Sequence, residues 1–257
     1  MRLAVHPTPD PIDPARRTVV LLHGITGSHR TWWRFAPALA DAGWQVLAMD
    51  LRCHGASDCD GPIGRWDAAD DVVETIVAEL GRPHVDVLWG HSLGARTALQ
   101  ALVRHPSLAD RAILEDPPGI IGNRGEEIVN WRREAALART DPGAYADEMR
   151  ADHPTWDERD VAAVVADVAT TRLEPLITAI EAGAAMNDPA HELVRRARIP
   201  ILLVVPPPEQ SVLGEVYDAT IAGLPPGSRA VRLDGGHTLH RDRPDEYLAA
   251  ALEWLAG

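Results

Sequence analysis

The chain has 257 residues and a formal net charge of −13 at pH 7, a length that permits one large α/β domain with an insertion. So acidic a chain repels phosphate backbones and anionic lipid heads, so we expect neither nucleic acid nor a membrane surface as its partner. All 25 basic residues are arginines, which excludes mechanisms that need a lysine base or a lysine Schiff base.

The N-terminal segment and the cysteines predict a soluble, cytoplasmic protein. Residues 1–14 hold no apolar segment of signal-peptide length, and no stretch reaches the ~18 to 20 apolar residues of a membrane span. Cys53 and Cys59 are too few for a disulfide framework, so we expect free thiols. The nearby His54, Asp58 and Asp60 match no zinc spacing, and no metal or cofactor is expected. The sequence carries no signal for an oligomeric state.

In chain order, short apolar runs rich in β-branched residues alternate with helical patterns. Near-continuous apolar strands are typical of a parallel sheet that is covered on both faces. The alternation predicts right-handed crossovers and an α/β fold with a doubly wound, mostly parallel sheet. Only 17 residues precede the first strong strand, so an opening antiparallel hairpin must be short. The expected strands are 18–24, 44–50, 85–90, 111–116, 199–205 and 228–234, and the expected helices are 31–43, 66–81, 93–105 and 244–257.

One long interruption of this alternation predicts an inserted helical cap. Residues 119–198 contain several helix-like stretches where a single crossover helix would suffice. Because the insertion follows a strand, it should lie over the carboxyl edge of the sheet, where open α/β sheets bind their ligands. We therefore assign residues 1–118 and 199–257 to the core and residues 119–198 to a cap, or lid.

The sequence Gly90-His91-Ser92-Leu93-Gly94 joins a predicted strand to a predicted helix. In strand-G-x-S-x-G-helix, the serine is forced onto a sharp turn that exposes its Oγ above the sheet, at the start of the helix. Ser92 is therefore the predicted nucleophile. The alternative is a serine with only a structural role in a turn.

Attack on an acyl carbon also needs donors for the oxyanion that develops. The backbone amide of Leu93, directly after the nucleophile, is one candidate. The amide of Ile25 is the second, because it follows a strand that ends at His23-Gly24. Together these two amides form the predicted oxyanion hole.

A serine hydroxyl needs a general base, and the chain has 11 histidines. His237 lies just past the last predicted strand, where a loop returns over the carboxyl edge of the sheet, and it is the favoured base. We expect His240 to be a surface residue near the closing helix. We expect His91 to point away from Oγ, and His23 to have a structural or substrate-facing role.

Four segments resemble the α/β-hydrolase superfamily: LLHGITGS (21–28), AMDLRCHGASD (48–58), GHSLG (90–94) and DGGHTLHRDRPDEYLAAALEWL (234–255). The resemblance implies a Ser-acid-His triad under a helical cap and no cofactor. The usual glycine of its R-G-H-G segment is Cys53 here, which we expect to affect packing. A serine in this turn argues against dehalogenases and epoxide hydrolases, which resemble this pattern but carry aspartate there.

The acid of the triad has two candidates. The family usually places it a few residues past the strand that follows the cap, where this chain has Glu209. Some members take it from the end of the preceding strand, where Asp116 stands 24 residues after Ser92. We favour Asp116, because the PPPEQ segment around Glu209 lacks the usual G-x-x-D form. Glu115 is a third candidate.

Large apolar side chains could line the substrate cavity. Trp131, Tyr145, Trp156 and Met186 lie in the predicted cap, and Trp32 follows the oxyanion loop. At helical spacing such residues more often pack within a cap or core than contact a substrate.

These patterns predict a serine hydrolase that cleaves an ester, lactone or related acyl bond of a small molecule through an acyl-enzyme. The same triad on the same fold also supports C–C hydrolysis, acyl transfer, hydroxynitrile cleavage or cofactor-free oxygenation. A non-catalytic ligand-binding member with a decayed triad is the third alternative.

Overall fold

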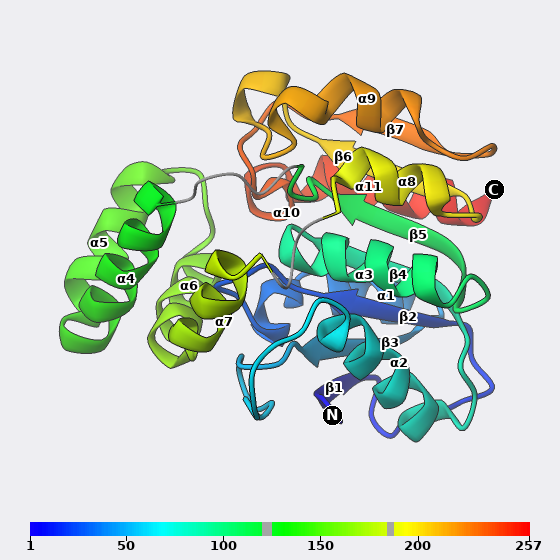
Figure 1. Cartoon of the computed structure of the whole chain (residues 1–257), viewed down its shortest axis with the longest axis horizontal. Coiled ribbons are helices and arrows are strands. Elements are labelled where there is room, and N and C mark those ends of the chain that lie inside the picture. Colours follow the sequence, from blue (N-terminus) through cyan, green and yellow to red (C-terminus); the bar gives the residue numbers. More distant parts are fainter. Residues whose placement is uncertain (120–124, 184–187) are drawn as a thin grey trace.

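The computed structural model describes residues 1–119, 125–183 and 188–257 (Figure 1). Within these ranges, seven strands form one sheet in the order β1-β3-β2-β4-β5-β6-β7. All neighbouring strands are parallel except β1, which runs antiparallel to β3. The six predicted strands and the α/β fold class are confirmed. The strands are β1 (Ala4–Thr8), β2 (Thr18–Leu22), β3 (Gln45–Asp50), β4 (Val85–His91), β5 (Ala109–Glu115), β6 (Ile201–Val205) and β7 (Arg229–Arg232).

Strand β1 replaces the opening hairpin that the sequence suggested. It pairs with β3, and Pro7 stands opposite Leu47 in this register. Proline has no backbone N–H to donate, so it is tolerated on a strand with one free edge. The proline-rich start of the chain therefore closes one edge of the sheet.

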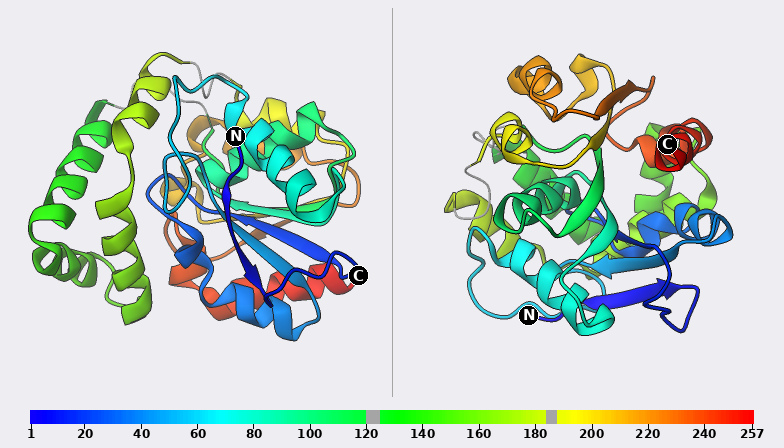
Figure 2. Two further views of the ribbon diagram at one scale, coloured as in Figure 1. Left: turned by 90° about the horizontal axis from the view of Figure 1, so that it is seen from below. Right: turned by 90° about the vertical axis from the view of Figure 1, so that its right-hand side faces the viewer.

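Helices cover both faces of the sheet, as the continuous burial of its strands requires. The helices around the sheet are α1 (Phe35–Asp41), α2 (Asp67–Leu80), α3 (Leu93–Arg104), α8 (Ala190–Arg196), α9 (Tyr217–Ala222), α10 (Leu239–Asp242) and α11 (Pro244–Ala256), with the 3-10 turns η1 (His29–Trp32), η2 (Pro208–Gln210) and η3 (Gly214–Val216). One face of the sheet is covered by α2, α3, α8 and α9, and the other face is covered by α1 and α11 (Figure 2). None of the helices in the described part of the chain has the length and apolar character needed to cross a membrane.

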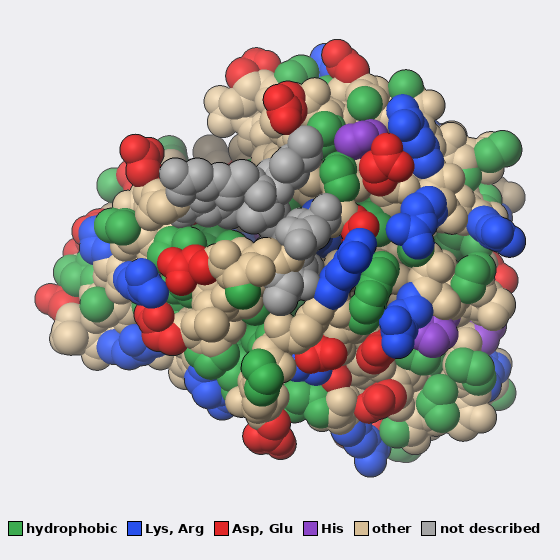
Figure 3. Space-filling view, in the orientation of Figure 1, with side chains coloured by type: hydrophobic (Ala, Val, Ile, Leu, Met, Phe, Trp, Pro, Cys, Tyr) green, Lys and Arg blue, Asp and Glu red, His purple; other side chains and the backbone are tan. Residues whose placement is uncertain are grey.

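Between β5 and β6 the chain forms a lobe of four helices within the described ranges, on one side of the sheet (Figure 1). These are α4 (Gly125–Thr140), α5 (Pro142–Asp152), α6 (Glu158–Thr170) and α7 (Leu173–Glu181). The lobe has its own apolar cluster, which includes Ile128, Val161 and Ile177. On the face in Figure 3, acidic and arginine side chains are interspersed across the lobe and the sheet domain, without a single basic patch.

Helix α8 lies within the residues that we assigned to the cap, but it packs on the sheet domain. Leu193 and Val194 of α8 are fully buried in the cluster that also contains residues of α3 and the sheet. The Ala190 amide donates to the carbonyl of Gly119 (3.0 Å). The chain therefore leaves the sheet domain after β5 and returns to it at α8 at neighbouring points. The helix therefore belongs to the core, because its apolar face packs on α3 and not on the lobe.

Cys53 and Cys59 form a disulfide, with 4.3 Å between their Cα atoms, and the expectation of free thiols was wrong. The loop between them folds back, because the Cys53 amide donates to the carbonyl of Asp58 (2.9 Å). Cys53 has φ 68°, a left-handed conformation that suits the glycine usual at this position. A short-range disulfide needs only such a turn, which the cysteine count could not predict.

Candidate active site

Ser92 lies on a sharp turn between β4 and α3, with φ 51° and ψ −115°. Its two flanking glycines are required by close backbone contacts. A Cβ on Gly90 would lie 2.4 Å from the backbone of Gly94, and a Cβ on Gly94 would lie 2.2 Å from the carbonyl oxygen of Leu22. A strained, non-glycine backbone held this tightly is typical of functional turns.

His237 and Asp116 are in direct contact, with 2.7 Å between Nδ1 and Oδ2. Asp116 directly follows β5 and is fully buried. Its carboxylate also accepts hydrogen bonds from the Ser211 hydroxyl and the Val212 amide. A buried carboxylate is tolerated when donors surround it in this way. The structure thus joins the imidazole to Asp116.

Glu209, the other candidate for the acid, does not contact His237 in the structure. Its side chain is exposed in η2, and the segment after it supplies the donors Ser211 and Val212 instead. Sequence reasoning missed Ser211. The available signal was topological: β6 pairs with β5, so the loop after β6 must pass the end of β5, where Asp116 lies.

Glu115, the third candidate, faces His240 instead of His237. Its carboxylate accepts from the backbone amide of His240 (3.0 Å) and lies 2.9 Å from His240 Nδ1. His240 is buried, so its expected surface position was wrong. His240 lies in the short helix α10, next to the buried Leu239, and its ring contacts Trp32, with ring centroids 5.5 Å apart. Burial raises the pKa of Glu115 to about 8, against the hydrogen bond from His240, and burial holds the pKa of His240 well below its usual value.

The raised pKa of Glu115 predicts a pH-dependent stability. The unfolded chain releases this proton near pH 4.5, while the folded chain keeps it to about pH 8, so stability falls as pH rises between these values. Glu115→Gln cannot ionise. From pH 5 to pH 8 we expect its free energy of unfolding to gain on wild type by roughly 3 to 4 kcal/mol. Urea denaturation at several pH values measures this gain, and the exposed Glu209→Gln is the control. A difference that stays constant with pH would contradict the assignment.

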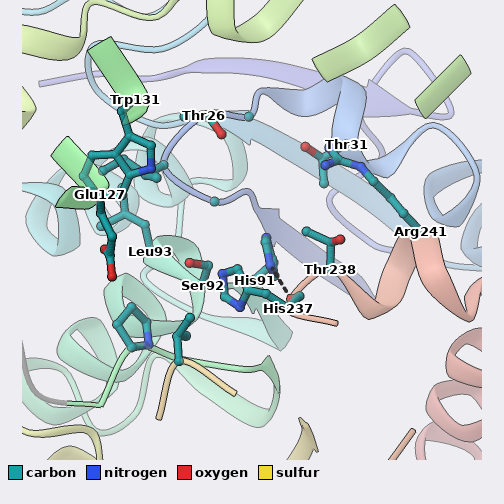
Figure 4. Close-up of a pocket in the computed structure, with 15 residues that line it drawn as sticks. Thr26, Thr31, His91, Ser92, Leu93, Glu127, Trp131, His237, Thr238 and Arg241 are labelled. Atoms are coloured by element: carbon teal, nitrogen blue, oxygen red, sulfur yellow. Dashed lines mark hydrogen bonds between the residues drawn. The ribbon is translucent and has the colours of Figure 1, made fainter. Parts of the chain in front are cut away.

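Ser92 and His237 line one pocket of about 260 Å³ (Figure 4). Both predicted oxyanion residues, Ile25 and Leu93, line the same pocket. Among the described residues, Ser92 Oγ has no hydrogen bond to His237. Catalytic contacts of this kind are often made only when substrate is bound. His91 also lines the pocket, and its Nε2 donates to the carbonyl of His237 (3.1 Å), so it holds the loop that carries the imidazole.

Of the predicted substrate residues, the structure places only Trp131 at this pocket. Trp32 is fully buried in the core between the sheet and α1, and Tyr145 packs inside the lobe. Trp156 donates to Asp242 Oδ1 (2.6 Å) and lines a different hollow. Met186 lies outside the described residues. Helical spacing alone could not separate these packing roles from contact with a ligand.

The pocket also has polar walls that the sequence did not indicate. Thr31, Glu127, Thr238 and Arg241 line it together with the residues already named. Arg241 stands four residues after His237, within α10, and this closeness along the chain was the only available signal.

Among the described residues, two groups of histidine and acidic side chains have atoms close enough to hold a metal ion: His6, His29 and Asp50, and the buried group of His91, Glu115 and His240. In the first group, both imidazoles already contact the Asp50 carboxylate, at 3.0 and 2.9 Å. Burial opposes ionisation of Asp50, but hydrogen bonds from His29 and the Ala56 amide hold its pKa well below the usual range. The Asp50 carboxylate is thus satisfied by protein donors, and Glu115 keeps its proton to about pH 8.

Comparison with known proteins begins with the sequence. A sequence model of the alpha/beta hydrolase fold matches residues 17–199. A relative from Pseudomonas putida named N-formylmaleamate deformylase is 28% identical over 248 residues, which cover 92% of this chain and 88% of that one. The first curated matches are shorter. The alignments span only 28% to 34% of a probable alcohol acetyltransferase from Cyberlindnera fabianii and of sn-1-specific diacylglycerol lipases from Mus musculus and Xenopus laevis.

Solved structures show the same architecture. The N-formylmaleamic acid deformylase of Pseudomonas putida S16 is 26% identical and superimposes with a TM-score of 0.71 over 91% of both chains. The enol-lactonase of Burkholderia xenovorans LB400, at 21% identity, has a TM-score of 0.77 over 99% of this chain and 96% of that one. At that identity, the second likeness concerns the fold alone.

Proposed function

Because the chain belongs to the alpha/beta hydrolase fold family, we propose that it is a serine hydrolase that cleaves an ester, lactone or related acyl bond of a small molecule. The observation that carries the proposal is the 2.7 Å contact of His237 with Asp116, made in the pocket onto which Ser92 opens. Ser92 attacks the acyl carbon, the leaving group departs, and water then releases the acyl group from Ser92.

His237 is the general base in this proposal. Its Nε2 takes the proton from Ser92 Oγ and returns it to the leaving group, while Nδ1 donates to Asp116. The Asp116 carboxylate thereby fixes the tautomer of the imidazole and stabilises the imidazolium that forms during attack.

The amides of Leu93 and Ile25 hold the oxyanion. Leu93 is the first residue of α3, where an amide has no acceptor within the helix. The loop of Ile25 is fixed from both sides: the Ile25 carbonyl accepts from His54 Nε2, and the Gly27 amide donates to the carbonyl of Gly24 (3.0 Å). His23 supports this loop, because burial lowers its pKa to about 3 and its neutral Nε2 accepts from the Leu51 amide (2.9 Å).

The lobe of α4 to α7 acts as the cap in this proposal. Glu127 and Trp131 of α4 line the pocket beside Ser92 (Figure 4), so the lobe contributes to the choice of substrate.

Hydrolysis of an N-formyl amide is a second candidate. It is favoured by the relative named N-formylmaleamate deformylase, which aligns over 92% of this chain. The same triad and oxyanion amides would serve, since an amide carbonyl passes through the same kind of tetrahedral intermediate.

A fluorophosphonate probe tests the proposal, because it labels only an activated serine. We expect stoichiometric labelling, with the modified peptide containing Ser92. A panel of p-nitrophenyl esters, lactones and N-formyl amides, with mass analysis of products, then separates the two candidates. Absence of labelling, with ligand binding intact, would instead support a non-catalytic member of the family.

A further inference from the structure

The pocket beside Ser92 has two ends of different chemistry (Figure 4). Glu127 and Trp131 lie on one side of Ser92, and Thr31 and Arg241 lie on the other. A substrate whose acyl carbon reaches Ser92 can therefore extend toward a carboxylate end or toward a guanidinium end.

Arg241 is an unusual lining residue because it is buried without a hydrogen bond. Its side chain is only 9% exposed, and its guanidinium makes no hydrogen bond with the described residues. Its Nε is fully enclosed and unpartnered, and so is the hydroxyl of Thr31. Burial of polar groups without hydrogen-bond partners is costly, so an unpartnered guanidinium nitrogen and an unpartnered hydroxyl at one end of a pocket indicate a polar ligand.

The carboxylates nearest to this end do not satisfy Arg241. Asp160 lies 3.8 Å from its Nε, and Asp160 Oδ1 accepts from Trp33 Nε1 (2.9 Å). Asp167 accepts from Arg30 (2.9 Å) and from the hydroxyl of Ser28 (2.7 Å). Asp160 therefore faces the enclosed Nε, and the two terminal amino groups of the guanidinium make no hydrogen bond with the described residues.

A guanidinium offers five N–H donors in a planar fork that matches the two oxygens of a carboxylate. Resting on the proposed function, we propose that Arg241, assisted by Thr31, binds a carboxylate of the substrate. The substrate is then an acyl compound with a second, anionic group. It lies with the anion at Arg241 and its scissile carbonyl at Ser92.

The test compares substrates that differ only in charge. These are p-nitrophenyl monoesters of four- to six-carbon dicarboxylic acids and their neutral monoamide counterparts. For the best chain length, we expect wild-type kcat/KM to be about 10- to 100-fold higher for the acid than for the amide. Arg241→Gln should reduce this ratio to near one, mainly through a higher KM for the acid.

Two further variants make the result specific. Arg241→Lys keeps the charge but not the fork, so it should retain part of the preference, and it decides the matter if Arg241→Gln does not fold. Arg150→Gln removes an equal charge from the exposed surface of the lobe, where Arg150 pairs with Glu158, and should keep the full ratio. A wild-type ratio near one, or an unchanged ratio in both Arg241 variants, would overturn the proposal.

A binding measurement separates this proposal from the proposed function. Calorimetry with Ser92→Ala should detect binding of the free dicarboxylate, and Ser92→Ala/Arg241→Gln should lose it. If wild type hydrolyses neither ester but this binding pattern holds, the hydrolase proposal fails and the carboxylate site stands. If the esters are cleaved without preference and no dicarboxylate binds, the hydrolase proposal stands and the carboxylate site fails.

Discussion

Ser92→Ala is expected to lower kcat on a short p-nitrophenyl ester by about 10⁴-fold or more. The hydroxyl is the only atom removed, and the turn that presents it is fixed by Gly90, by Gly94 and by a hydrogen bond from the Ser92 amide to the carbonyl of Glu115 (2.9 Å). Alanine should adopt the same backbone at the same cost as serine. The loss should therefore appear in kcat, with KM and Tm close to wild type.

The control for this experiment is Ser107→Ala, an exposed serine far along the chain from the turn, which should keep full activity. Steady-state kinetics and fluorophosphonate labelling should change together for Ser92→Ala. A variant that still hydrolyses the ester at the wild-type rate would show that Ser92 is not the nucleophile, whatever its backbone conformation.

Local signals predicted the parts of the molecule that local chemistry determines. The turn at Ser92 could be predicted because its glycines are required by close contacts with residues nearby in the sequence and with the adjacent strand β2. The strands β2 to β6 could be predicted because burial on both faces leaves near-continuous apolar runs. The place of His237, after the last strand, followed from the strand order alone.

The remaining features depend on contacts between distant segments. The partner of His237 could not be decided from sequence, because it depends on where the loop after β6 places Ser211 and Val212 relative to Asp116. Glu209 had the expected offset along the chain, but it is exposed in η2. The spacing of a motif gives distance along the backbone, whereas a hydrogen bond needs distance in space.

Burial of polar side chains was the other source of error. His240 was expected at the surface because it lies in a polar segment, yet it is buried with Glu115. Trp32 was expected at the substrate, yet it packs between Phe35 and Trp89. In each case the sequence identified a chemically capable residue, and tertiary packing determined whether it faced the pocket or the core.

The second large effect concerns the acid, for which Asp116→Asn and Glu209→Gln form a matched pair. We expect Asp116→Asn to lower kcat by about 10⁴-fold and Glu209→Gln to change it less than twofold. In the asparagine variant, the amide nitrogen replaces one of two oxygens that both accept hydrogen bonds, from His237 and Val212 on one and from Ser211 on the other. With the amide nitrogen in place of Oδ2, it faces the Val212 amide and forces His237 into the wrong tautomer. With the nitrogen in place of Oδ1, the Ser211 hydroxyl can rotate to accept from it, but the neutral amide oxygen that then faces His237 stabilises the imidazolium less than a carboxylate does.

Comparison of kcat for the two variants at saturating substrate measures this difference, and Tm reports whether each variant folds. The reverse order of effects would assign the acid to Glu209 and require a movement of η2 toward His237 on substrate binding. Small losses in both variants would mean that His237 acts without a carboxylate. A selective loss in Asp116→Asn, with folding intact, requires the carboxylate at the end of β5, because the buried site that holds Asp116 has its donors arranged for two oxygens.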